Sequence, residues 1–481
     1  MVTFRQRLRP FLARPCMAAA IATAAALCAT AACAAAAGEA LPSFAELEAR
    51  GATIGEIRVV TKDIFDTGDP HEDKWLFRLA NKLHIQTRPH VIEGALLFRR
   101  GDKLSARLID ETERTLRANR YLYEVQIRPL AVHDDHVVDI EVQTRDTWTI
   151  DVGASASRQG GSNAGGLQIQ DVNVAGTGIS IGYSHARNVD RSSHEFRIAD
   201  PRLFNTWTSL SLSHATYSDG GRDALSLQHP FYALETRWGV GLSAMKDDRL
   251  ESVYLGGEVA AQYRHRQQRA EAWGGLSSGL VDGWVHRWSA GVELREDAYA
   301  LEPGLVPPAR LGRDDRLLVP FVRYERVQDR FERDLNRDLI GRPEYFALGL
   351  ATSVQLGVAG TGFGSTRDAV RYAASASRGF APGENQLLMA AAKVQGEFFD
   401  GRVQRQQWDM EAQLYLPQGH RWLLHAALAG SLLTRPEANE ALLLGGDNGL
   451  RGYPLRYQSG TRRVLGTVEE RFYTDLYVWR L

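Results

Sequence analysis

Two short segments have residue types that could carry chemistry, and neither has the local structure that the chemistry needs. Residues Gly275–Gly279 read Gly-Leu-Ser-Ser-Gly and match the G-x-S-x-G elbow of serine hydrolases. That elbow exposes its serine where a strand turns into a helix, whereas this segment lies in a strand-like run with no helix behind it. Residues Gly360–Gly364 are rich in glycine but lack the lysine and hydroxyl side chain of a phosphate-binding loop. We therefore expect no catalytic site and no enzyme activity.

The histidines and cysteines indicate neither a metal site nor a disulfide. Thirteen histidines are spread along the chain without the spacing of a ligand set. The cysteines Cys16, Cys28 and Cys33 all lie close to the N-terminus, so the rest of the chain needs neither a disulfide framework nor a cysteine-bound metal. We expect no metal and no other cofactor.

The N-terminal segment has the order of a secretory signal peptide. Residues 1–38 contain four arginines and no acidic residue, and an alanine-rich run from Met17 to Ala37 ends in several small-x-small cleavage patterns. A transmembrane anchor is the alternative, because about 20 apolar residues can span a bilayer. Alanine is only weakly apolar, however, and the cleavage patterns favour a signal peptide over residues 1–38.

Charge and hydropathy then limit the class of protein. Removal of residues 1–38 changes the formal net charge from −1 to about −5. No basic excess remains to neutralise phosphates, so we expect no nucleic-acid partner. After residue 40 no apolar run approaches the length of a helical membrane span. Such a chain can still cross a membrane as a β-barrel, because closure pairs the backbone hydrogen-bonding groups.

Residues 53–145 are expected to form a small α+β domain in the order strand, helix, helix, strand, strand. The second helix runs from about Ser105 to Asn119, with Ser105 as its predicted N-cap. One face of the first helix is apolar and is formed by Trp75, Leu76, Leu79 and Leu83.

Residues 147–481 have the alternation of an all-β transmembrane antiparallel barrel. Segments of about ten residues alternate apolar with small or polar side chains between Gly, Asp, Asn and Pro turns, as in Trp408–Leu416 and Phe346–Ala351. Strands of about this length cross a bilayer at a tilt. Aromatic residues near strand ends, such as Tyr183 and Trp422, are typical of interfacial girdles. A soluble sandwich would also alternate, but with the signal peptide we expect a membrane barrel of twelve to sixteen strands.

Several segments resemble one family. Phe98–Ile127 resembles the core of a POTRA domain, the periplasmic module that precedes barrels of the BamA/TamA superfamily. Thr144–Ser155 resembles the entry into the first barrel strand of that superfamily, and Asp171–Arg187 resembles its D-x-N-x-x-G-T-G hairpin. Residues 199–207 and 227–241 resemble the strands that follow.

The most specific similarity is Gly445–Pro454, GGDNGLRGYP. It resembles the R-G-Y/F motif at the tip of a long extracellular loop that folds back into the barrel lumen in this superfamily. By this resemblance the loop covers residues 445–461, and its loop-lock motif consists of Leu450, Arg451, Gly452 and Tyr453.

The resemblance also implies a partner for the motif arginine. Gly466–Phe472, GTVEERF, resembles a following strand whose E-x-R-F pattern places Glu469 opposite Arg451. An arginine in a polar lumen can form bidentate, charge-assisted bonds to a carboxylate. We therefore expect Arg451 and Glu469 to hold the loop against the wall, while alternation puts Glu470 on the opposite face of the strand.

Two features depart from the superfamily. Fewer strands than usual follow the motif and more precede it, so we expect either a fragment or a differently organised barrel, and we favour a fragment with a gap between the first and last strands. A single POTRA-like domain precedes the barrel, where assembly factors carry several, and this weakens the inference of a general barrel-assembly role.

The resemblance implies an outer-membrane barrel of the BamA/TamA type in a Gram-negative bacterium, with the POTRA-like domain in the periplasm. It would insert or translocate unfolded client polypeptides, which add a strand to an edge of that domain, and its other partner would be outer-membrane lipid. A two-partner secretion transporter remains open in the same class. A passive pore or anchor without a client is the alternative from a different class, and an outer-membrane phospholipase lacks a site.

Overall fold

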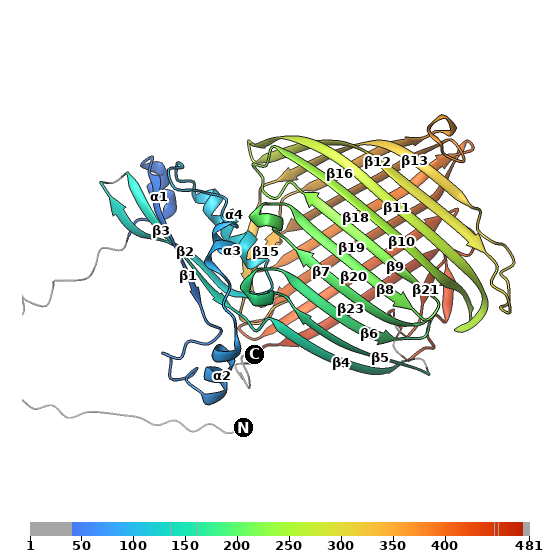
Figure 1. The fold of residues 1–481 in the computed structure, drawn as a ribbon, viewed down its shortest axis with the longest axis horizontal. Coiled ribbons are helices and arrows are strands. Elements are labelled where there is room, and N and C mark those ends of the chain that lie inside the picture. The colour runs from blue at the N-terminus through green and yellow to red at the C-terminus, as the bar shows by residue number, and fades with distance from the viewer. Residues whose placement is uncertain (1–40, 135, 160, 447, 451, 475–481) are drawn as a thin grey trace, which may run out of the picture.

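The computed structural model describes residues 41–474 except 135, 160, 447 and 451. The signal peptide predicted over residues 1–38 therefore lies outside the described residues. The described chain forms a small domain of helices and strands, followed by a large antiparallel sheet that curves into a barrel (Figure 1). None of the described helices is long and apolar enough to cross a membrane.

The small domain packs helices on a mixed three-stranded sheet. Its central strand β3 runs parallel to β1 and antiparallel to β2. The buried core joins the sheet to the helices through side chains such as Val138, Ile109 and Leu116. The elements are α1 (Phe44–Ala49), β1 (Thr53–Lys62), α2 (Trp75–Leu83), α3 (Pro89–Glu93), α4 (Ala106–Arg117), β2 (Leu122–His133) and β3 (Val137–Asp146).

The helices differ from the sequence expectation in two respects. The short helices α1 and α3 were not predicted, because five or six residues are too few to show a helical period. Ser105 is the N-cap of α4, as predicted, but its side chain makes no capping hydrogen bond. In α2 the apolar residues Trp75, Leu79 and Leu83 share a face, yet that face is exposed and the helix packs instead through Phe77 and Ala80.

Sixteen strands of the described chain form one antiparallel sheet, which confirms the predicted barrel. Neighbours in the sheet follow the order of the chain throughout. The strands are β4 (Ile150–Gln159), β5 (Ser162–Asp171), β6 (Ser180–Arg187), β7 (Ser192–Asp200), β8 (Ser209–Tyr217), β9 (Gly220–His229), β10 (Trp238–Leu255), β11 (Glu258–Val281), β12 (Trp284–Ala300), β13 (Asp315–Gln328), β16 (Ala351–Ala359), β17 (Ala369–Phe380), β18 (Leu387–Phe399), β19 (Arg402–Pro417), β20 (Trp422–Thr434) and β23 (Arg462–Phe472).

Two hairpins stand apart from this sheet. One is formed by β14 (Phe331–Leu335) and β15 (Pro343–Ala347), in the turn from β13 to β16 at the end of the barrel that faces the small domain. The other is formed by β21 (Leu442–Leu444) and β22 (Gln458–Gly460), in the loop from β20 to β23. The prediction of one barrel strand over Phe346–Ala351 is wrong: the alternation runs from the end of β15 into the start of β16, and alternation alone does not show where a strand leaves the sheet.

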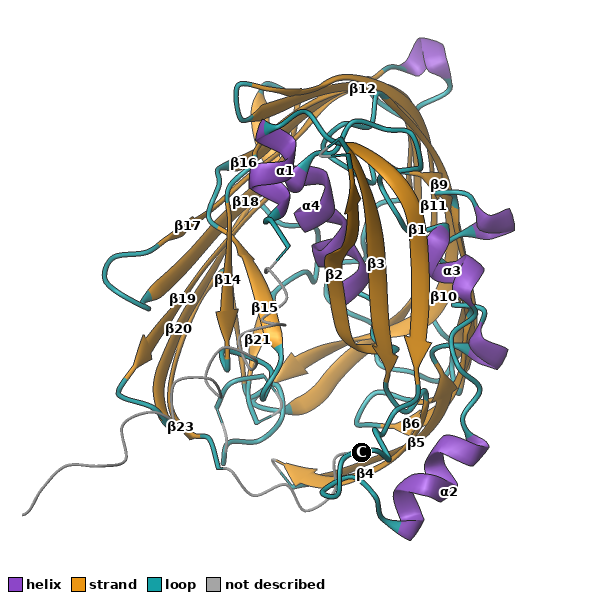
Figure 2. Cartoon of the chain, turned by 90° about the vertical axis from the view of Figure 1, so that its left-hand side faces the viewer, coloured by secondary structure: helices purple, strands orange, loops and turns teal. Residues whose placement is uncertain are grey.

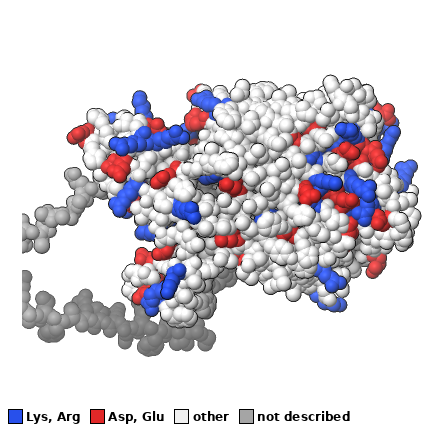
Figure 3. Space-filling model, in the orientation of Figure 1, with Lys and Arg blue, Asp and Glu red and all other residues white. Residues whose placement is uncertain are grey.

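The outer face of the barrel is apolar around its middle. Charged side chains gather at the end of the barrel away from the small domain, while the middle of the visible face is largely free of them (Figure 3). An exposed apolar belt between polar ends is typical of a barrel in a bilayer. Large outward-facing members of the belt, each more than 40% exposed, are Val152, Ile169, Val240, Leu242, Leu276, Trp288, Val322, Leu356, Met410, Leu428, Val464 and Val468.

The sheet has two edge strands, β4 and β23. Strand β4 leaves the small domain and β23 runs back toward it, so the two are antiparallel, as neighbours in an even-numbered barrel must be. Within the described residues no pairing joins them, and an end-on view shows them on either side of the opening in the ring (Figure 2). The fragment expected from the sequence stays a prediction, because residues 475–481 lie outside the described residues.

Candidate functional site: the lumen loop and its anchors

The loop that carries the R-G-Y motif runs over residues 435–461 between β20 and β23. Its two short strands pair in register from Leu442 with Gly460 to Leu444 with Gln458. A tight turn closes the tip. Asn448 accepts a hydrogen bond from the Gly445 backbone (2.6 Å) and donates one to the Leu443 carbonyl (2.8 Å).

This loop lies inside the barrel, against β23. Val464 and Val468 of β23 face outward, with 72% and 75% of their surface exposed, so alternation turns Leu465 inward. Gly449 sits directly on Leu465, because a Cβ added there would lie 2.5 Å from the leucine side chain. The Gly449 backbone, at φ +135°, has the left-handed conformation that favours glycine. The described part of the loop thus packs against the inner face of β23, and the loop lock expected from the resemblance stays a prediction.

The predicted bond between Arg451 and Glu469 remains a prediction, because Arg451 lies outside the described residues. Glu469 faces the lumen, and its carboxylate accepts hydrogen bonds from Arg471 at 3.1 and 3.2 Å. The Nδ1 atom of His425 lies 3.7 Å from the same carboxylate. The other members of the motif, Leu450, Gly452 and Tyr453, lie at the loop tip, where the Tyr453 amide donates to the Leu450 carbonyl.

A different arginine of the same loop makes a well-defined contact with another part of the barrel. Arg456 donates two bonds to Asp190, at 2.9 and 2.6 Å, and the hydroxyl of Tyr254 donates a third at 2.5 Å. Asp190 lies in the turn from β6 to β7, so the pair joins the loop to a strand connection on the other side of the opening between β23 and β4. Arg456 has φ +54°, a strained value for this residue. The pair could not be predicted from the sequence, because no local pattern connects two residues 266 positions apart.

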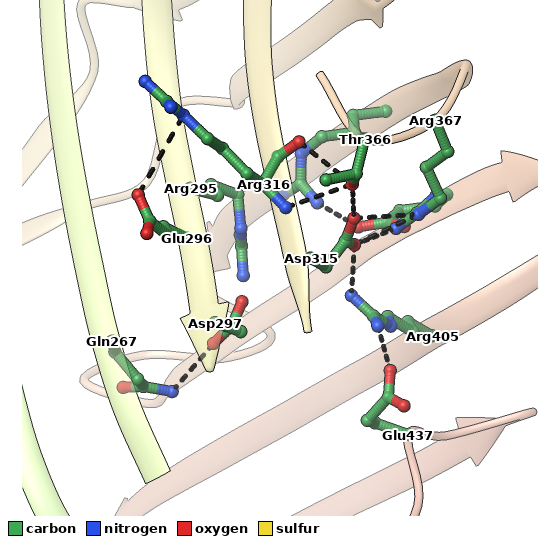
Figure 4. Close-up of polar contacts among 12 residues, drawn as sticks. Gln267, Arg295, Glu296, Asp297, Asp315, Arg316, Thr366, Arg367, Arg405 and Glu437 are labelled. Atoms are coloured by element: carbon green, nitrogen blue, oxygen red, sulfur yellow. Dashed lines mark hydrogen bonds and ion pairs between the residues drawn. The ribbon is translucent and has the colours of Figure 1, made fainter. Parts of the chain in front are cut away.

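A second anchor connects the loop to a ladder of charged side chains on the inner wall. Glu437 at the start of the loop pairs with Arg405 of β19, and Arg405 also contacts Asp315 of β13 (3.3 Å) (Figure 4). The ladder continues through Arg367, which bonds both Asp315 and Glu397 at 2.6 Å. Arginines and carboxylates alternate along this ladder, so each positive charge is paired with a negative charge.

These groups line a polar cavity of about 580 Å³ beneath the loop. Arg295 and Asp297 of β12 face it from one wall, and Figure 4 shows them across from the Asp315–Arg405 group. Asn439 of the loop also reaches the carbonyl of Arg310, in the turn from β12 to β13, at 2.6 Å. The loop thus covers this end of the lumen with contacts to three separate parts of the wall.

The end of the lumen that faces the small domain is crossed by the β14–β15 hairpin. Asp338 at its tip contacts Arg471 of β23 (3.2 Å) and accepts a bond from Tyr415 of β19 (2.9 Å). At its base Tyr345 donates to Glu113 of α4 (3.3 Å). The hairpin therefore connects the small domain to the inner face of the edge strand β23, and the end-on view shows it inside the ring (Figure 2).

The small domain is joined to the barrel turns by a buried hydrogen-bond network. Asp146, at the end of β3, is fully buried and accepts bonds from the Thr87 amide (2.7 Å) and from the Thr87 hydroxyl (2.9 Å). The ring of His84 lies 2.9 Å from the same carboxylate. Asn173 donates to Thr87 (2.8 Å) and accepts from the Gly178 amide (2.6 Å).

This network gives the D-x-N-x-x-G-T-G segment of the β5–β6 turn a structural role in this chain. Gly176, at φ +72°, brings the β5–β6 turn so close that an added Cβ would lie 2.2 Å from the Gln86 carbonyl oxygen. Burial beside this joint raises the pKa of Tyr121 to about 12. The turn from β9 to β10 also docks, since the Leu234 amide donates to Glu111 of α4 (2.8 Å).

The segments weighed for chemistry lie elsewhere. Gly275–Gly279 belongs to β11, where the Ser277 hydroxyl accepts from the Gly279 amide (3.0 Å), and another strand follows. Gly360–Gly364 forms the turn from β16 to β17. Among the described residues, no group of three or more His, Cys, Asp or Glu side chains could hold a metal ion.

Comparisons with known proteins give matches among solved structures alone. No family model matches the sequence, and no curated protein matches it. Among solved structures it is similar to "BamA from Haemophilus ducreyi lacking POTRA domains 1-3", with a TM-score of 0.34, 12% identity, and coverage of 79% of this chain and 72% of that chain. It is also similar to CdiB from Acinetobacter baumannii (TM-score 0.41, 11% identity, 89% and 68% covered) and to CdiB from Escherichia coli (0.42, 10%, 86% and 76%).

Proposed function

We propose that this protein is an outer-membrane barrel of the BamA/TamA type in a Gram-negative bacterium, which inserts or translocates unfolded polypeptide clients. The small domain would act as a POTRA-like domain in the periplasm. The observation that carries the proposal is the pair of edge strands, β4 and β23, in an otherwise continuous sheet, directly beside a small domain that has edge strands of its own. No catalytic step and no cofactor is part of the proposal.

Edge strands in a bilayer have a strong tendency to accept another strand. An unpaired backbone group in hydrocarbon costs several kcal/mol, because no water is present to bond it. A client segment that adds to β4 or β23 would satisfy those groups by strand addition. The edge strands β1 and β2 of the small domain could hold a client by the same backbone pairing before it reaches the barrel.

The lumen elements support a role for β23 as the moving edge. Its inner face is contacted by the loop at Leu465 and by the β14–β15 hairpin at Arg471. Release of either contact would free part of the strand. The loop thus restrains β23 from the far end of the barrel, and the hairpin restrains it from the end where a client would arrive.

Two-partner secretion is a second candidate, because the inner wall is polar. The charged ladder around Asp315 and Arg405 gives a route through the lumen that an extended polypeptide could follow once the loop and hairpin move aside. A passive pore would share this polar lumen but would need no client.

Reconstitution distinguishes these possibilities. The purified chain in liposomes is mixed with a urea-unfolded outer-membrane barrel, and the folded client is measured by heat-modifiable gel migration. Insertion predicts folding at least several-fold faster than in empty liposomes. Client protected inside the vesicles but not folded into the bilayer would favour secretion, and ion conductance with no effect on any client would favour a passive pore.

A further inference from the structure

Helix α2 carries an exposed apolar stripe. Trp75, Leu79 and Leu83 are spaced by four residues, so they lie on one face, and they are 70%, 41% and 64% exposed. Ile85, just beyond the helix, is 60% exposed and extends the exposed apolar surface. Leaving this much apolar surface in water is unfavourable, at about 25 cal/mol per Å². An exposed apolar stripe of this kind marks a surface that contacts another apolar phase or partner.

The opposite face of α2 is fixed, so the helix cannot turn to bury the stripe. The ring of Phe77 stacks on Phe65 with centroids 4.0 Å apart. Asn81 donates to the Phe65 carbonyl (2.8 Å) and accepts from the Phe65 amide (3.1 Å). The exposed stripe is therefore part of the folded arrangement.

The helix is also placed beside the apolar belt of the barrel. Its packing cluster includes Trp148, two residues before β4 begins. On β4 the belt begins at Val152, which is 72% exposed. Val152 follows Trp148 by four residues, which is about 13 Å of extended chain at about 3.3 Å per residue. Strand tilt shortens that distance along the barrel axis. Viewed end-on, α2 lies outside the ring of strands, next to β4 (Figure 2).

Basic residues flank the stripe. Lys74, Arg78 and Lys82 are exposed, and Lys82 lies between the positions of Arg78 and Leu79 around the helix. Arg78 pairs with Asp73. Lysine stems can lie along apolar surface while their ammonium groups reach phosphates. A short helix with a tryptophan-bearing apolar face and flanking lysines is typical of helices that lie in a membrane interface.

We propose that α2 lies in the phospholipid leaflet on the small-domain side of the barrel and anchors the domain beside the edge strand β4. Continuity with the lipid-facing belt and the flanking positive charge favour lipid over a second copy of the chain or a peptide. The inference rests on the proposed membrane location, but it does not depend on a client. The helix would fix the position of the small domain relative to the membrane surface. It would thereby hold the edge strands β1 and β2 of the domain close to the barrel edge strand β4.

Spin labels test the position of the helix in the full chain. Cys16, Cys28 and Cys33 are replaced by serine, and a label is placed at Leu83→Cys in one variant and at Leu79→Cys in another. The chain is reconstituted in vesicles of phosphatidylethanolamine and phosphatidylglycerol, and collisions of the label with oxygen and with a water-soluble nickel complex are measured. His90→Cys, exposed on α3 of the same domain, is the aqueous control. Leu242→Cys, on the outer face of β10, is the lipid control.

The proposal predicts that the ratio of oxygen to nickel collisions at both α2 positions exceeds that at His90→Cys by about threefold or more, approaching Leu242→Cys. A ratio equal to that at His90→Cys would show the stripe in water and overturn the proposal. Low collision with both reagents would show it covered by protein and also overturn it. If the label at Leu242→Cys is not exposed to lipid, the proposed membrane location is wrong and so is the membrane anchor. If the label at Leu242→Cys is exposed to lipid while the labels on α2 are in water, only the membrane anchor is wrong.

Discussion

Breaking the bond between Arg456 and Asp190 should release the lumen loop. The two side chains are joined by bonds of 2.9 and 2.6 Å and keep only 22% and 17% of their surface exposed. The pair connects the loop to the β6–β7 turn, so its loss removes a direct restraint on loop opening. The variants are Arg456→Ala, Asp190→Ala and the double variant.

The size of the effect follows from the geometry. Opposite charges about 4 Å apart attract by about 4 kcal/mol at an effective dielectric constant near 20. Residual water contact and lost side-chain freedom reduce the net value, which we place at about 2 kcal/mol, between surface pairs and buried pairs. Since every 1.4 kcal/mol is a factor of ten, the open loop should become about 30-fold more populated.

Single-channel recording in planar bilayers measures the fraction of time in the high-conductance state. The double-mutant cycle isolates the coupling of the two residues from other contacts that each makes, such as the Tyr254 hydroxyl on Asp190. Arg197→Ala removes an exposed pair with Glu195 on the same inner wall and serves as the matched control. That control should change the open fraction by less than about twofold.

Two results would exclude this role of the Arg456–Asp190 pair. Open fractions within twofold of the parent in both single variants would show that the pair does not hold the loop. Strictly additive effects would show that each residue acts through other contacts, so that the bond itself contributes nothing.

Three further perturbations address the joints of the molecule. Gly176→Ala should lower the thermal unfolding midpoint of the chain, because its Cβ would meet the Gln86 carbonyl and its φ is +72°; Gly161→Ala has a similar φ (+83°) with open space and should cost less. Asp338→Ala should make the β14–β15 hairpin more cleavable by added protease in vesicles, since it removes the carboxylate that accepts from Arg471 and Tyr415 and leaves the Arg337 carbonyl as the hairpin's acceptor for Arg471; unchanged cleavage would exclude a restraint by Asp338. The hydrogen bond from His133 lowers the pKa of Asp139 in the folded chain. The stability that the Asp139 carboxylate contributes is therefore present above the unfolded carboxyl pKa and is lost as pH falls through the lowered pKa. Asp139→Asn should make the free energy of unfolding depend less on pH in that window, and an unchanged pH profile would contradict this.

The barrel could be predicted from sequence because its signal is local. Alternation with a period of two reports which face of a strand meets an apolar phase, and each strand carries the signal independently. The hairpin β14–β15 alternates in the same way, so the run Phe346–Ala351 was assigned to the barrel. Whether a strand pairs with the sheet or leaves it depends on distant neighbours that alternation does not encode.

The candidate site was predicted only in part, for the same physical reason. The motif marked the loop and its approach to β23, and it placed Glu469 on the lumen face. The described anchor between Arg456 and Asp190 depends on the height of the loop in the barrel and on a turn 266 residues away. In α2 the helical period correctly placed Trp75 on the apolar face, but it could not show that this face is exposed. An apolar face can pack against a protein core or lie in a lipid interface, and the period is the same in both cases.

Photo-cross-linking at the two edge strands shows whether a client pairs with β4 or β23 while it folds. Benzoylphenylalanine is placed at Val152 of β4, at Val468 of β23, and at Leu242 in the middle of the sheet, all outward-facing. During folding of an unfolded barrel client in liposomes, strand addition at the edges should give client adducts at Val152 and Val468 and none at Leu242. Equal labelling at all three positions, or client folding with no adduct at either edge strand, would contradict it.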